Sequence, residues 1–282
     1  MVIIDPWGHR GNLAWVDAQL RSRGLDPARP TVEALAIHDQ LHSGGLKATT
    51  SFLRWTRPRA GDQVLDLGAG LGGTARLLAR DHGCRVTALE RSVPLHDAAT
   101  TLSSRFDLDP PVEHVLGDAT RFRSGEGFDL IMVQHVDMHI ENKSALYRTC
   151  AENLAPQGRL VWHDWLAGPS GLPRYPVPWS NEGEGSFLTH ETSFRDVLRR
   201  AGFSAVTVLD LTGDTTGWYQ SSLERLRGAL ARPIPSDPAL RERRAELERL
   251  LIASENVLAS IEERSLIPFF GQAMFAKSSL PA

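Results

Sequence analysis

Apolar positions along the chain follow two alternating patterns: short continuous runs, and longer stretches with helical spacing. The runs QVLDL, RVTALE, PVEHV, FDLIMVQH and GRLVWHDW predict five buried strands. Stretches of about ten to fifteen residues with helical spacing separate these runs, for example GTARLLARDH and KSALYRTCAENL. Strands that alternate with helices in this way form right-handed crossovers, which favours a parallel sheet covered on both faces.

The flanks of this region have different patterns. Before it, residues 12–23 and 31–57 have helical spacing. After it, residues 166–190 are rich in glycine and proline but also contain large aromatic residues, which favours an ordered lid or binding loop over a disordered segment. A further helix and strand, two long helical stretches and a final strand, FFGQAMFAK, complete the pattern.

The composition is typical of a globular protein with a substantial core. Hydrophobic residues make up 41% and charged residues 23% of the 282 positions, and the formal net charge is −3. Because no basic stripe is present, a nucleic-acid partner is not expected. Cys84 and Cys150 provide neither a disulfide framework nor metal-ligand spacing, and no secretory leader or apolar run of ~20 residues is found. We therefore expect a cytoplasmic protein without a membrane partner.

A glycine-rich turn carries the first candidate chemistry. The sequence DLGAGLGG places Gly68, Gly70 and Gly73 in GxGxxG spacing between a predicted strand and a predicted helix, and Glu90 ends the next strand. Glycine lets the backbone approach a ligand closely, and an acid one strand away can accept hydrogen bonds from two ribose hydroxyls. The spacing suits NAD or another adenosine-containing ligand, and it also fits a tight turn that binds nothing.

Three features favour a ligand other than NAD. Asp66 precedes the first glycine by two positions, about sixty residues of helical preface come before the glycine strand, and GDAT (117–120) follows the third strand. The segments VLDLGAGLGGTARLLA, TALERS, LGDAT, FDLIMVQHV and LAPQGRLVWHDW together resemble class I S-adenosylmethionine (SAM) dependent methyltransferases, above all small-molecule enzymes of the sarcosine, sugar and natural-product type. The resemblance covers residues 60–210. The chain departs from the usual pattern of the family at Glu90, where Asp is more frequent, and at LAPQG, where LKPGG is usual.

This resemblance implies an α/β fold of the Rossmann-like class I methyltransferase type. Its seven-stranded, mostly parallel sheet has the order 3-2-1-4-5-7-6, with strand 7 antiparallel. Residues 1–59 would form a helical preface that caps SAM and the acceptor, and residues 60–282 would form the SAM-binding methyltransferase domain. Within that domain we expect an acceptor-side loop at 166–190 and a helical insertion at 217–265 before the last strand.

The resemblance also implies a cofactor site, residue by residue. The backbone at Gly68 and Gly70 would flank the methionine moiety of SAM, and Asp66 would support the turn and the ligand amine. Glu90 would hold the ribose hydroxyls, and Arg91 would lie beside the adenine.

Further cofactor contacts are implied at three more places. Asp118 and Ala119 would contact the adenine edge, and the backbone of Gln134 would accept from the SAM ammonium group. In the preface, HDQLHSGGLKATTSFL (38–53) resembles the stretch that folds over SAM in related enzymes, which makes His42 a further cofactor-binding candidate. The alternative for this stretch is a helix that ends at Ser43-Gly44-Gly45, because glycines commonly terminate helices.

The segment MVQHVDMHIENK, at the end of the fourth predicted strand, holds His135, Asp137 and His139 within five positions. The resemblance places His139 and Asp164 where the methyl acceptor binds. We therefore predict that His139 is the general base, and that Asp164 orients its imidazole or binds the acceptor directly. His135 and Asp137 are interpreted as structural, and His163 is expected to face away from Asp164 because the two alternate along a strand.

A metal site is the competing interpretation of this cluster, since His135, Asp137, His139 and Asp164 offer nitrogen and oxygen ligands. The metal-dependent O-methyltransferases of this fold use oxygen ligands, which suit magnesium, whereas this chain has histidine at the decisive positions. No metal is therefore predicted. A solvated turn without a chemical role is the other alternative.

The sequence thus predicts an enzyme that transfers a methyl group from SAM to an oxygen or nitrogen of a small, partly apolar metabolite, and that leaves S-adenosylhomocysteine. A role in natural-product biosynthesis fits this interpretation. We expect Tyr175, Trp179 and Phe187 to border the acceptor pocket. The alternatives are a carbon methyltransferase, a methyltransferase-like cyclase, or a SAM-binding module without catalysis. The expected partner is a small-molecule methyl acceptor, and a homodimer is one of the oligomeric states that the sequence leaves open.

Overall fold

The computed structural model describes residues 13–40, 42–232 and 238–275. Three helices precede the sheet: α1 (Leu13–Ser22), α2 (Val32–Asp39) and α3 (Gly45–Thr56). The helical spacing across 31–57 is therefore interrupted between α2 and α3. Gly44 directly precedes α3 in the left-handed conformation, with φ 84°. The glycines at 44 and 45 thus begin a helix, and the alternative in which they end one is wrong.

The predicted alternation of strands and helices follows. Its elements are β1 (Gln63–Leu67), α4 (Gly73–His82), β2 (Arg85–Glu90), α5 (Val93–Ser103), β3 (Glu113–Leu116), β4 (Phe128–Gln134), the 3-10 turn η1 (Asp137–His139), α6 (Lys143–Asn153) and β5 (Leu154–Ala167). The C-terminal part adds α7 (Glu191–Arg200), β6 (Phe203–Asp210), α8 (Thr212–Leu230), α9 (Pro238–Glu262) and β7 (Leu266–Phe275). The last strand begins earlier than FFGQAMFAK, whose final two residues lie outside the described ranges.

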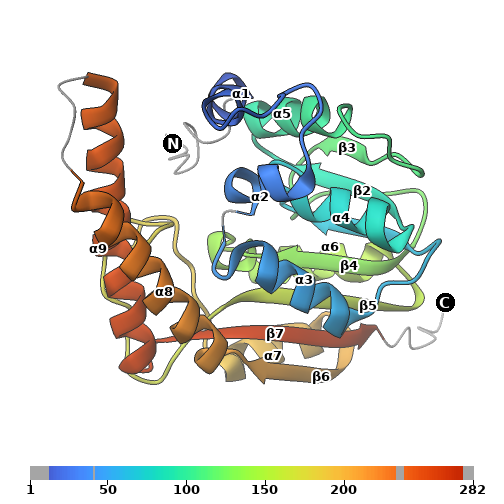
Figure 1. Ribbon diagram of the computed structural model, residues 1–282. Helices are drawn as coiled ribbons and strands as arrows, with labels where there is room; N and C mark the ends of the chain where they lie inside the picture. The colour runs from blue at the N-terminus through green and yellow to red at the C-terminus, as the bar shows by residue number, and fades with distance from the viewer. Residues whose placement is uncertain (1–12, 41, 233–237, 276–282) are drawn as a thin grey trace.

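The strands form one seven-stranded sheet in the order β3-β2-β1-β4-β5-β7-β6 (Figure 1). Strands β1 to β5 pair in parallel, and β7 runs antiparallel to both β5 and β6. This confirms the predicted topology. Because parallel strands end at the same edge of a sheet, the residues that follow β1, β2, β3, β4 and β5 meet there, which is where open α/β sheets bind ligands.

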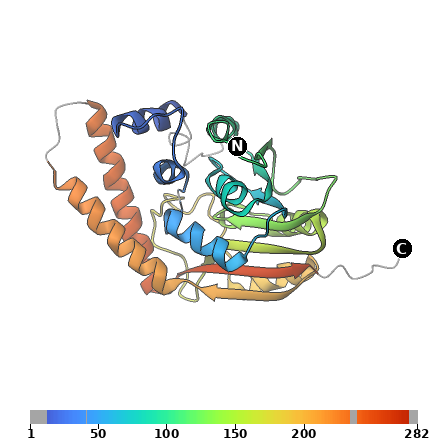
Figure 2. The same cartoon turned by 45° about the vertical axis from the view of Figure 1, so that its right-hand side comes forward.

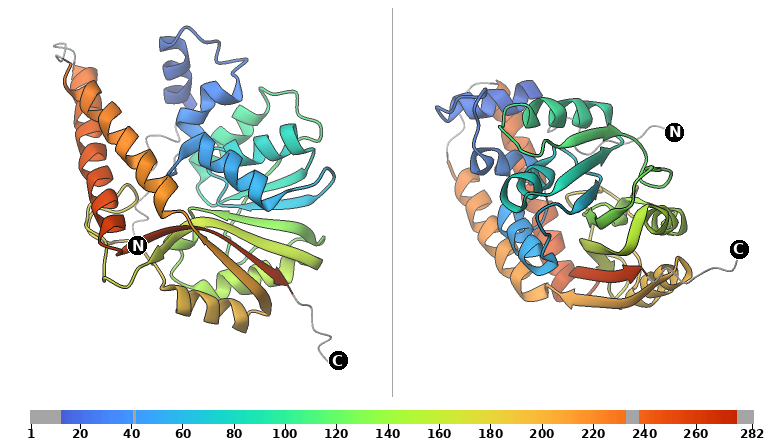
Figure 3. Two further views of the ribbon diagram at one scale, coloured as in Figure 1. Left: turned by 60° about the horizontal axis from the view of Figure 1, so that its bottom comes forward. Right: turned by 90° about the vertical axis from the view of Figure 1, so that its right-hand side faces the viewer.

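Alternation along β1 divides the core into two layers. Leu65 packs in the layer that includes Tyr147 of α6 and Phe194 of α7. Val64 packs in the other layer, with Phe52 of α3 and with α4. Helices therefore cover both faces of the sheet, with α3 and α4 on one face and α6 and α7 on the other (Figure 3).

Buried contacts join the preface to the sheet. Leu35 of α2 shares an apolar cluster with Leu102 of α5. The guanidinium of Arg76 in α4 pairs with Asp39 at the end of α2 at 2.6 Å, and neither side chain is more than 2% exposed. Removing one partner would leave an uncompensated buried charge, so this ion pair fixes α2 against the beginning of α4.

Helices α8 and α9 pack against each other beside the edge where the parallel strands end (Figures 1 and 2). Tyr219 of α8 and Val257 of α9 share a buried cluster with Trp165 of β5 and Trp179 of the 166–190 loop. This pair corresponds to the helical insertion predicted at 217–265, although α8 already begins at Thr212. None of the helices within the described ranges is sufficiently long and apolar to cross a membrane.

Candidate active site

The glycine-rich turn between β1 and α4 has Gly68, Gly70 and Gly72 in the left-handed region, with φ of 72°, 55° and 76°. A Cβ on Gly68 would lie 2.4 Å from Cγ2 of Val136, so this position is tightly packed against the turn after β4. A Cβ on Gly70 would meet nothing within 4 Å. The turn therefore leaves open space at Gly70, where a ligand can approach the backbone.

Glu90, at the end of β2, is bound to this turn. Its Oε2 accepts a hydrogen bond from the Gly70 amide at 3.0 Å, and its Oε1 accepts one from the Ser92 amide at 2.8 Å. Each carboxylate oxygen has a second lone pair. The carboxylate is thus fixed in place and can still accept from a ligand hydroxyl beside Gly70.

Asp66, in β1, is a buried carboxylate whose polar oxygens are not fully hydrogen-bonded. The residue is 2% exposed, and its Oδ2 has no hydrogen-bond partner among the described residues. Burial and, to a smaller extent, the nearby charge of Glu90 raise the pKa of this carboxyl to about 7. A cationic group would compensate the charge, so Asp66 and Glu90 together suit a ligand that carries an ammonium group and hydroxyls.

The residues predicted for the adenine end lie after β2 and β3. Asp118 is exposed, and its Oδ1 accepts from the amide of Thr120 at 2.8 Å and from its hydroxyl at 2.7 Å. These bonds hold the turn after β3 and leave Oδ2 free of local partners. Arg91 is also exposed, whereas Ala119 packs partly against the core.

The connection between α2 and α3 contacts the glycine turn. A Cβ on Gly73 would lie 2.5 Å from Nε2 of Gln40 and 2.7 Å from Cγ of Asp39, which explains the third glycine of the GxGxxG spacing. The hydroxyls of Ser43 and Tyr219 meet at 3.0 Å, so the same connection also contacts α8. The preface therefore bridges the cofactor side of the edge and the helical pair.

At the turn after β4, Asp164 does not pair with His139 in the described chain. Its Oδ2 accepts from the amides of Val136 at 2.9 Å and Asp137 at 2.8 Å, and its Oδ1 accepts from the Trp165 amide at 2.8 Å. The residue is fully buried. Burial and, to a smaller extent, the charge of Asp137 raise its pKa to about 7. The carboxylate holds the turn after β4, and the prediction that it orients the His139 imidazole is wrong.

The 166–190 loop orients His139 instead. Nδ1 of His139 lies 3.3 Å from the carbonyl oxygen of Gly185, and because a carbonyl only accepts, Nδ1 carries the proton. Burial lowers the pKa of the imidazole, so the ring is neutral near pH 7. Its Nε2 therefore has a lone pair that can accept a proton.

Asp137 has structural partners. Its carboxylate accepts from the Tyr147 hydroxyl and forms an ion pair with Lys143 at 2.8 Å. With Asp137 and Asp164 both engaged, the metal-ligand set considered from the sequence is not assembled in the structure.

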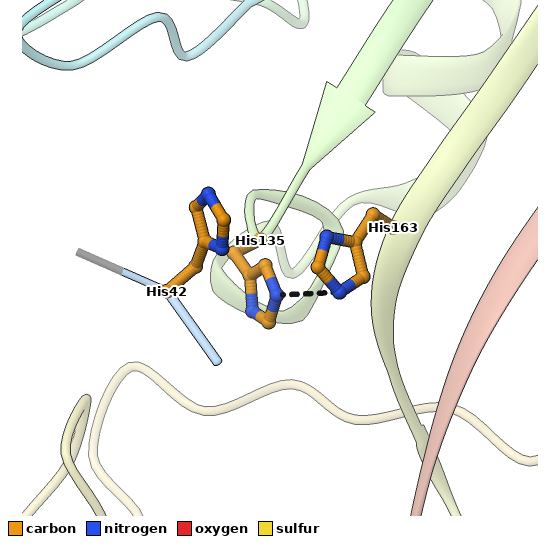
Figure 4. A group of neighbouring side chains, drawn as sticks. All are labelled: His42, His135 and His163. Atoms are coloured by element: carbon orange, nitrogen blue, oxygen red, sulfur yellow. Dashed lines mark hydrogen bonds between the residues drawn. The ribbon is translucent and has the colours of Figure 1, made fainter. Parts of the chain in front are cut away.

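The structure instead brings together His42, His135 and His163 (Figure 4). One ring nitrogen of each lies within 4.8 Å of the other two. Nε2 of His135 is 3.4 Å from Nε2 of His163. The rings of His42 and His135 are stacked with centroids 5.2 Å apart, and the ring of His163 stands edge-on to both. This cluster, from three separate segments, is the main feature of the site that sequence reasoning missed.

Backbone geometry directs two of these rings. His135 has φ 55°, a left-handed conformation that residues other than glycine seldom adopt, and its amide donates to the carbonyl of His163 at 2.8 Å. His163 contacts Phe52 and Phe270 in the layer of α3. Its neighbour Asp164 points to the opposite face, as alternation along a strand requires.

Burial keeps these three imidazoles neutral. It lowers the pKa of His42 to about 4 and the pKa values of His135 and His163 well below their ordinary value. A positive charge on one ring would repel a positive charge on the others. This repulsion also lowers the pKa values of His135 and His163. Each ring thus offers one nitrogen lone pair at neutral pH.

Aromatic residues of the 166–190 loop have different environments. Trp179 is 5% exposed and stacks on Trp165 with centroids 5.7 Å apart, so it belongs to the core. Tyr175 lines a cavity of about 200 Å³ formed within the loop. Phe187 is half-buried, and its amide donates to the carbonyl of Met138 at 2.7 Å. The loop is thus attached both to the core and to the turn that carries His139.

A sequence profile of the family described as "Methyltransferase domain" matches residues 40–208, which is more than half of the chain. The chain belongs to the class I SAM-dependent methyltransferases. This confirms the resemblance on which the predicted fold and cofactor rested.

Several relatives of this methyltransferase are small-molecule enzymes. The chain is 28% identical over 185 residues to phosphoethanolamine N-methyltransferase 1 of Arabidopsis thaliana, covering 65% of this chain and 37% of that protein. It is 27% identical over 171 residues to sarcosine/dimethylglycine N-methyltransferase of Halorhodospira halochloris, covering 59% of this chain and 61% of the relative. The chain thus spans little more than a third of the plant enzyme's length.

A solved structure with a similar fold is phosphoethanolamine N-methyltransferase 2 of Haemonchus contortus, in complex with phosphomonomethylethanolamine and S-adenosylhomocysteine. Its TM-score to this methyltransferase is 0.70 at 17% identity, covering 93% of this chain and 59% of that chain. At this identity the likeness shows the shared fold.

Two further residues of this methyltransferase border the predicted cofactor site. Val93 and Leu116 are 52% and 48% exposed. Leu116 is the register partner of Glu90 in the sheet, and Val93 begins the helix that follows β2. The sequence shows both as ordinary apolar residues, and only their exposure beside Glu90 distinguishes them.

Proposed function

We propose that this methyltransferase binds SAM at the glycine turn and methylates an oxygen or nitrogen of a small, partly apolar metabolite, releasing S-adenosylhomocysteine. One arrangement carries the proposal. Asp66 is buried with an unpaired oxygen, Gly70 leaves open space, and Glu90 is fixed with lone pairs to spare. SAM carries an ammonium group and two ribose hydroxyls, which match these features. The N-methyltransferases among the relatives support a small-molecule acceptor.

We assign the cofactor roles from the position of each residue along the edge where the parallel strands end. The backbone at Gly68 and Gly70 would hold the methionine part, Asp66 would compensate the ammonium group, and Glu90 would accept from the ribose hydroxyls. The other proposed contacts come from Arg91, Asp118, Ala119, Val93 and Leu116 around the adenine, and from the backbone of Gln134 at the amine. His42 would cover the reactive end of the cofactor from the preface.

SAM supplies an electrophilic methyl group when it is bound. The task of the chain is to place the acceptor in line with that group and to exclude water. An oxygen acceptor must also lose a proton, and Nε2 of the neutral His139 would accept it. The carbonyl of Gly185 would keep this imidazole in position through Nδ1, whereas Asp164 would hold the backbone of the turn after β4 without contacting the ring.

We further propose that residues 1–59 act as the cap and residues 60–282 as the methyltransferase domain, with the 166–190 loop on the acceptor side. The contacts of the α2–α3 connection with the glycine turn and with Tyr219 support a cap that closes over both ligands. A cytoplasmic enzyme of natural-product biosynthesis is the setting that we propose. The free, buried thiols of Cys84 and Cys150 fit a reducing compartment.

Calorimetric titration with SAM, S-adenosylhomocysteine and NAD tests the cofactor assignment. Glu90→Ala and Gly70→Val are each expected to weaken SAM binding at least about tenfold, which corresponds to about 1.4 kcal/mol. Glu113→Ala, on the exposed side of β3, is the matched control and should bind like the unchanged protein. Unchanged SAM affinity in both site variants, or equally strong NAD binding, would refute the assignment. Formation of S-adenosylhomocysteine with a metabolite extract separates an enzyme from a binding module.

A further inference from the structure

We propose that His42, His135 and His163 form a binding site for a divalent transition metal of the zinc class. The three side chains come from the α2–α3 connection, the turn after β4, and β5, and they converge at the acceptor side of the edge (Figure 4). The site is separate from the cofactor carboxylates and from the proposed base. Its existence does not depend on the proposed methyl transfer.

The spacing of the nitrogens fits a metal centre. Zinc–nitrogen bonds of about 2.0–2.1 Å in tetrahedral geometry place two ligand nitrogens about 3.3 Å apart. The Nε2 atoms of His135 and His163 are 3.4 Å apart. A nitrogen of His42 lies within 4.8 Å of both.

The rings of His42 and His163 also have polar partners outside the cluster. Nδ1 of His42 lies 3.2 Å from the carbonyl oxygen of Ser43, to which it donates, so the lone pair is on Nε2. Nδ1 of His163 lies 3.1 Å from the side-chain amide of Gln134. In the structure the amide nitrogen of Gln134 faces Nδ1, so Nε2 of His163 carries the proton and points to His135; metal binding would move this proton to Nδ1 and turn the Gln134 amide. Metal-binding histidines regularly have such a partner on the other ring nitrogen.

The type of ligand selects the type of metal. Neutral imidazoles bind zinc, copper, nickel, cobalt and iron, whereas magnesium and calcium require oxygen ligands. Burial keeps these imidazoles unprotonated, so no proton has to be displaced before a metal binds. The left-handed backbone of His135 is a second, independent indication, because strained residues concentrate at functional sites.

Three histidines leave one coordination position open, as in catalytic zinc sites, where water or a substrate oxygen takes the fourth place. The Gln134 amide that contacts His163 also accepts from Thr74 at the beginning of α4. The open position would therefore lie near the glycine turn. There the metal can bind an oxygen of the acceptor. Metal binding would also tie the preface to β4 and β5, so it should stabilise the fold.

Cobalt(II) titration of the EDTA-treated full chain tests the site, because tetrahedral cobalt has visible d–d bands. We expect a saturable spectrum at one equivalent, loss of the bands on zinc addition, and a higher Tm with either metal. His42→Ala and His163→Gln should weaken cobalt binding by roughly 100-fold or more, and Gln134→Ala, which removes the second partner of His163, by about 10–100-fold. His96→Ala, which changes a ring on α5 paired with Asp97, is the control and should keep the spectrum.

Absence of a saturable spectrum in the unchanged protein would overturn the proposal, as would equal binding in the His42 and His163 variants. His42→Ala changes a connection rather than the sheet, so it remains informative if His163→Gln does not fold. SAM calorimetry on the unchanged protein and on His163→Gln reports the cofactor site, because His42 belongs to both proposed sites and His163 does not. A negative result for the metal site therefore does not change the result for the cofactor site, and the reverse also holds.

Discussion

Replacing Asp66 with Asn is expected to stabilise the ligand-free protein increasingly as the pH rises. Burial and Glu90 raise the carboxyl pKa from 3.8 to about 7, a shift of about three units. At about 1.36 kcal/mol per unit, the ionised group costs roughly 4 kcal/mol in the folded, ligand-free state. A raised folded-state pKa means that the native state binds the proton more tightly than the unfolded state, so stability is lost between about pH 4 and pH 7. Asparagine carries no charge and removes this dependence.

Urea unfolding at pH 5 and at pH 8 measures the effect. The stability of Asp66→Asn relative to the unchanged protein should increase by roughly 3 kcal/mol between these two pH values. Any pH-independent loss, such as a weaker hydrogen bond of the amide, cancels in this comparison. Asp107→Asn, at an exposed position, is the control and should show no change. In calorimetry at pH 8, Asp66→Asn should bind SAM at least about tenfold more weakly, because the ammonium group loses its counter-charge.

Two results would refute this reasoning. Parallel stability curves for the variant and the unchanged protein would show that Asp66 is not an uncompensated charge. A larger pH-dependent difference with undiminished SAM affinity would show that the buried carboxylate serves the fold and not the cofactor.

Other expected outcomes concern the base, the glycine turn and the loop. His139→Ala should lower turnover by roughly 10²–10⁴, measured as S-adenosylhomocysteine release, with SAM affinity unchanged; full turnover would mean that the acceptor needs no base there. Gly68→Ala should lower Tm more than Gly70→Ala, because only the first Cβ would meet Val136 at 2.4 Å; equal losses would contradict this packing. Limited proteolysis within residues 166–190 should slow when S-adenosylhomocysteine is bound; identical cleavage would separate the loop from the site.

The parallel sheet was predictable because local patterns determine it. The continuous apolar runs of β1 and β4 are buried on both faces, and the helices between them have the length of a crossover. The glycine turn and Glu90 were predictable for the same reason, since a short stretch of sequence fixes a strand, a turn and a helix in order. The end of β2 then places its last residue beside that turn, within 3.0 Å of the Gly70 amide.

The partner of Asp164 was not predictable from spacing. The family resemblance places both Asp164 and His139 where the methyl acceptor binds, which suggested a pair. In the structure Asp164 lies inside β5 and His139 in the turn η1. The unpaired amides of the turn after β4 compete for the same carboxylate, and a buried amide without an acceptor costs as much as a lost hydrogen bond. With Val136 and Asp137 both donating to it, the carboxylate oxygen faces the turn, and His139 finds its acceptor in Gly185.

The histidine cluster depends on three placements that no single segment encodes. His163 and Asp164 alternate along β5 and point to opposite faces of the sheet. The interpretation that places Asp164 at the acceptor therefore places His163 away from it. His135 reaches His163 only because its backbone turns left-handed at the end of β4, whereas an extended residue would point elsewhere. His42 joins them through a connection fixed by the buried pair of Asp39 and Arg76. The cluster is therefore a property of tertiary packing, and weakening that ion pair should loosen the cluster while all three histidines stay in the chain.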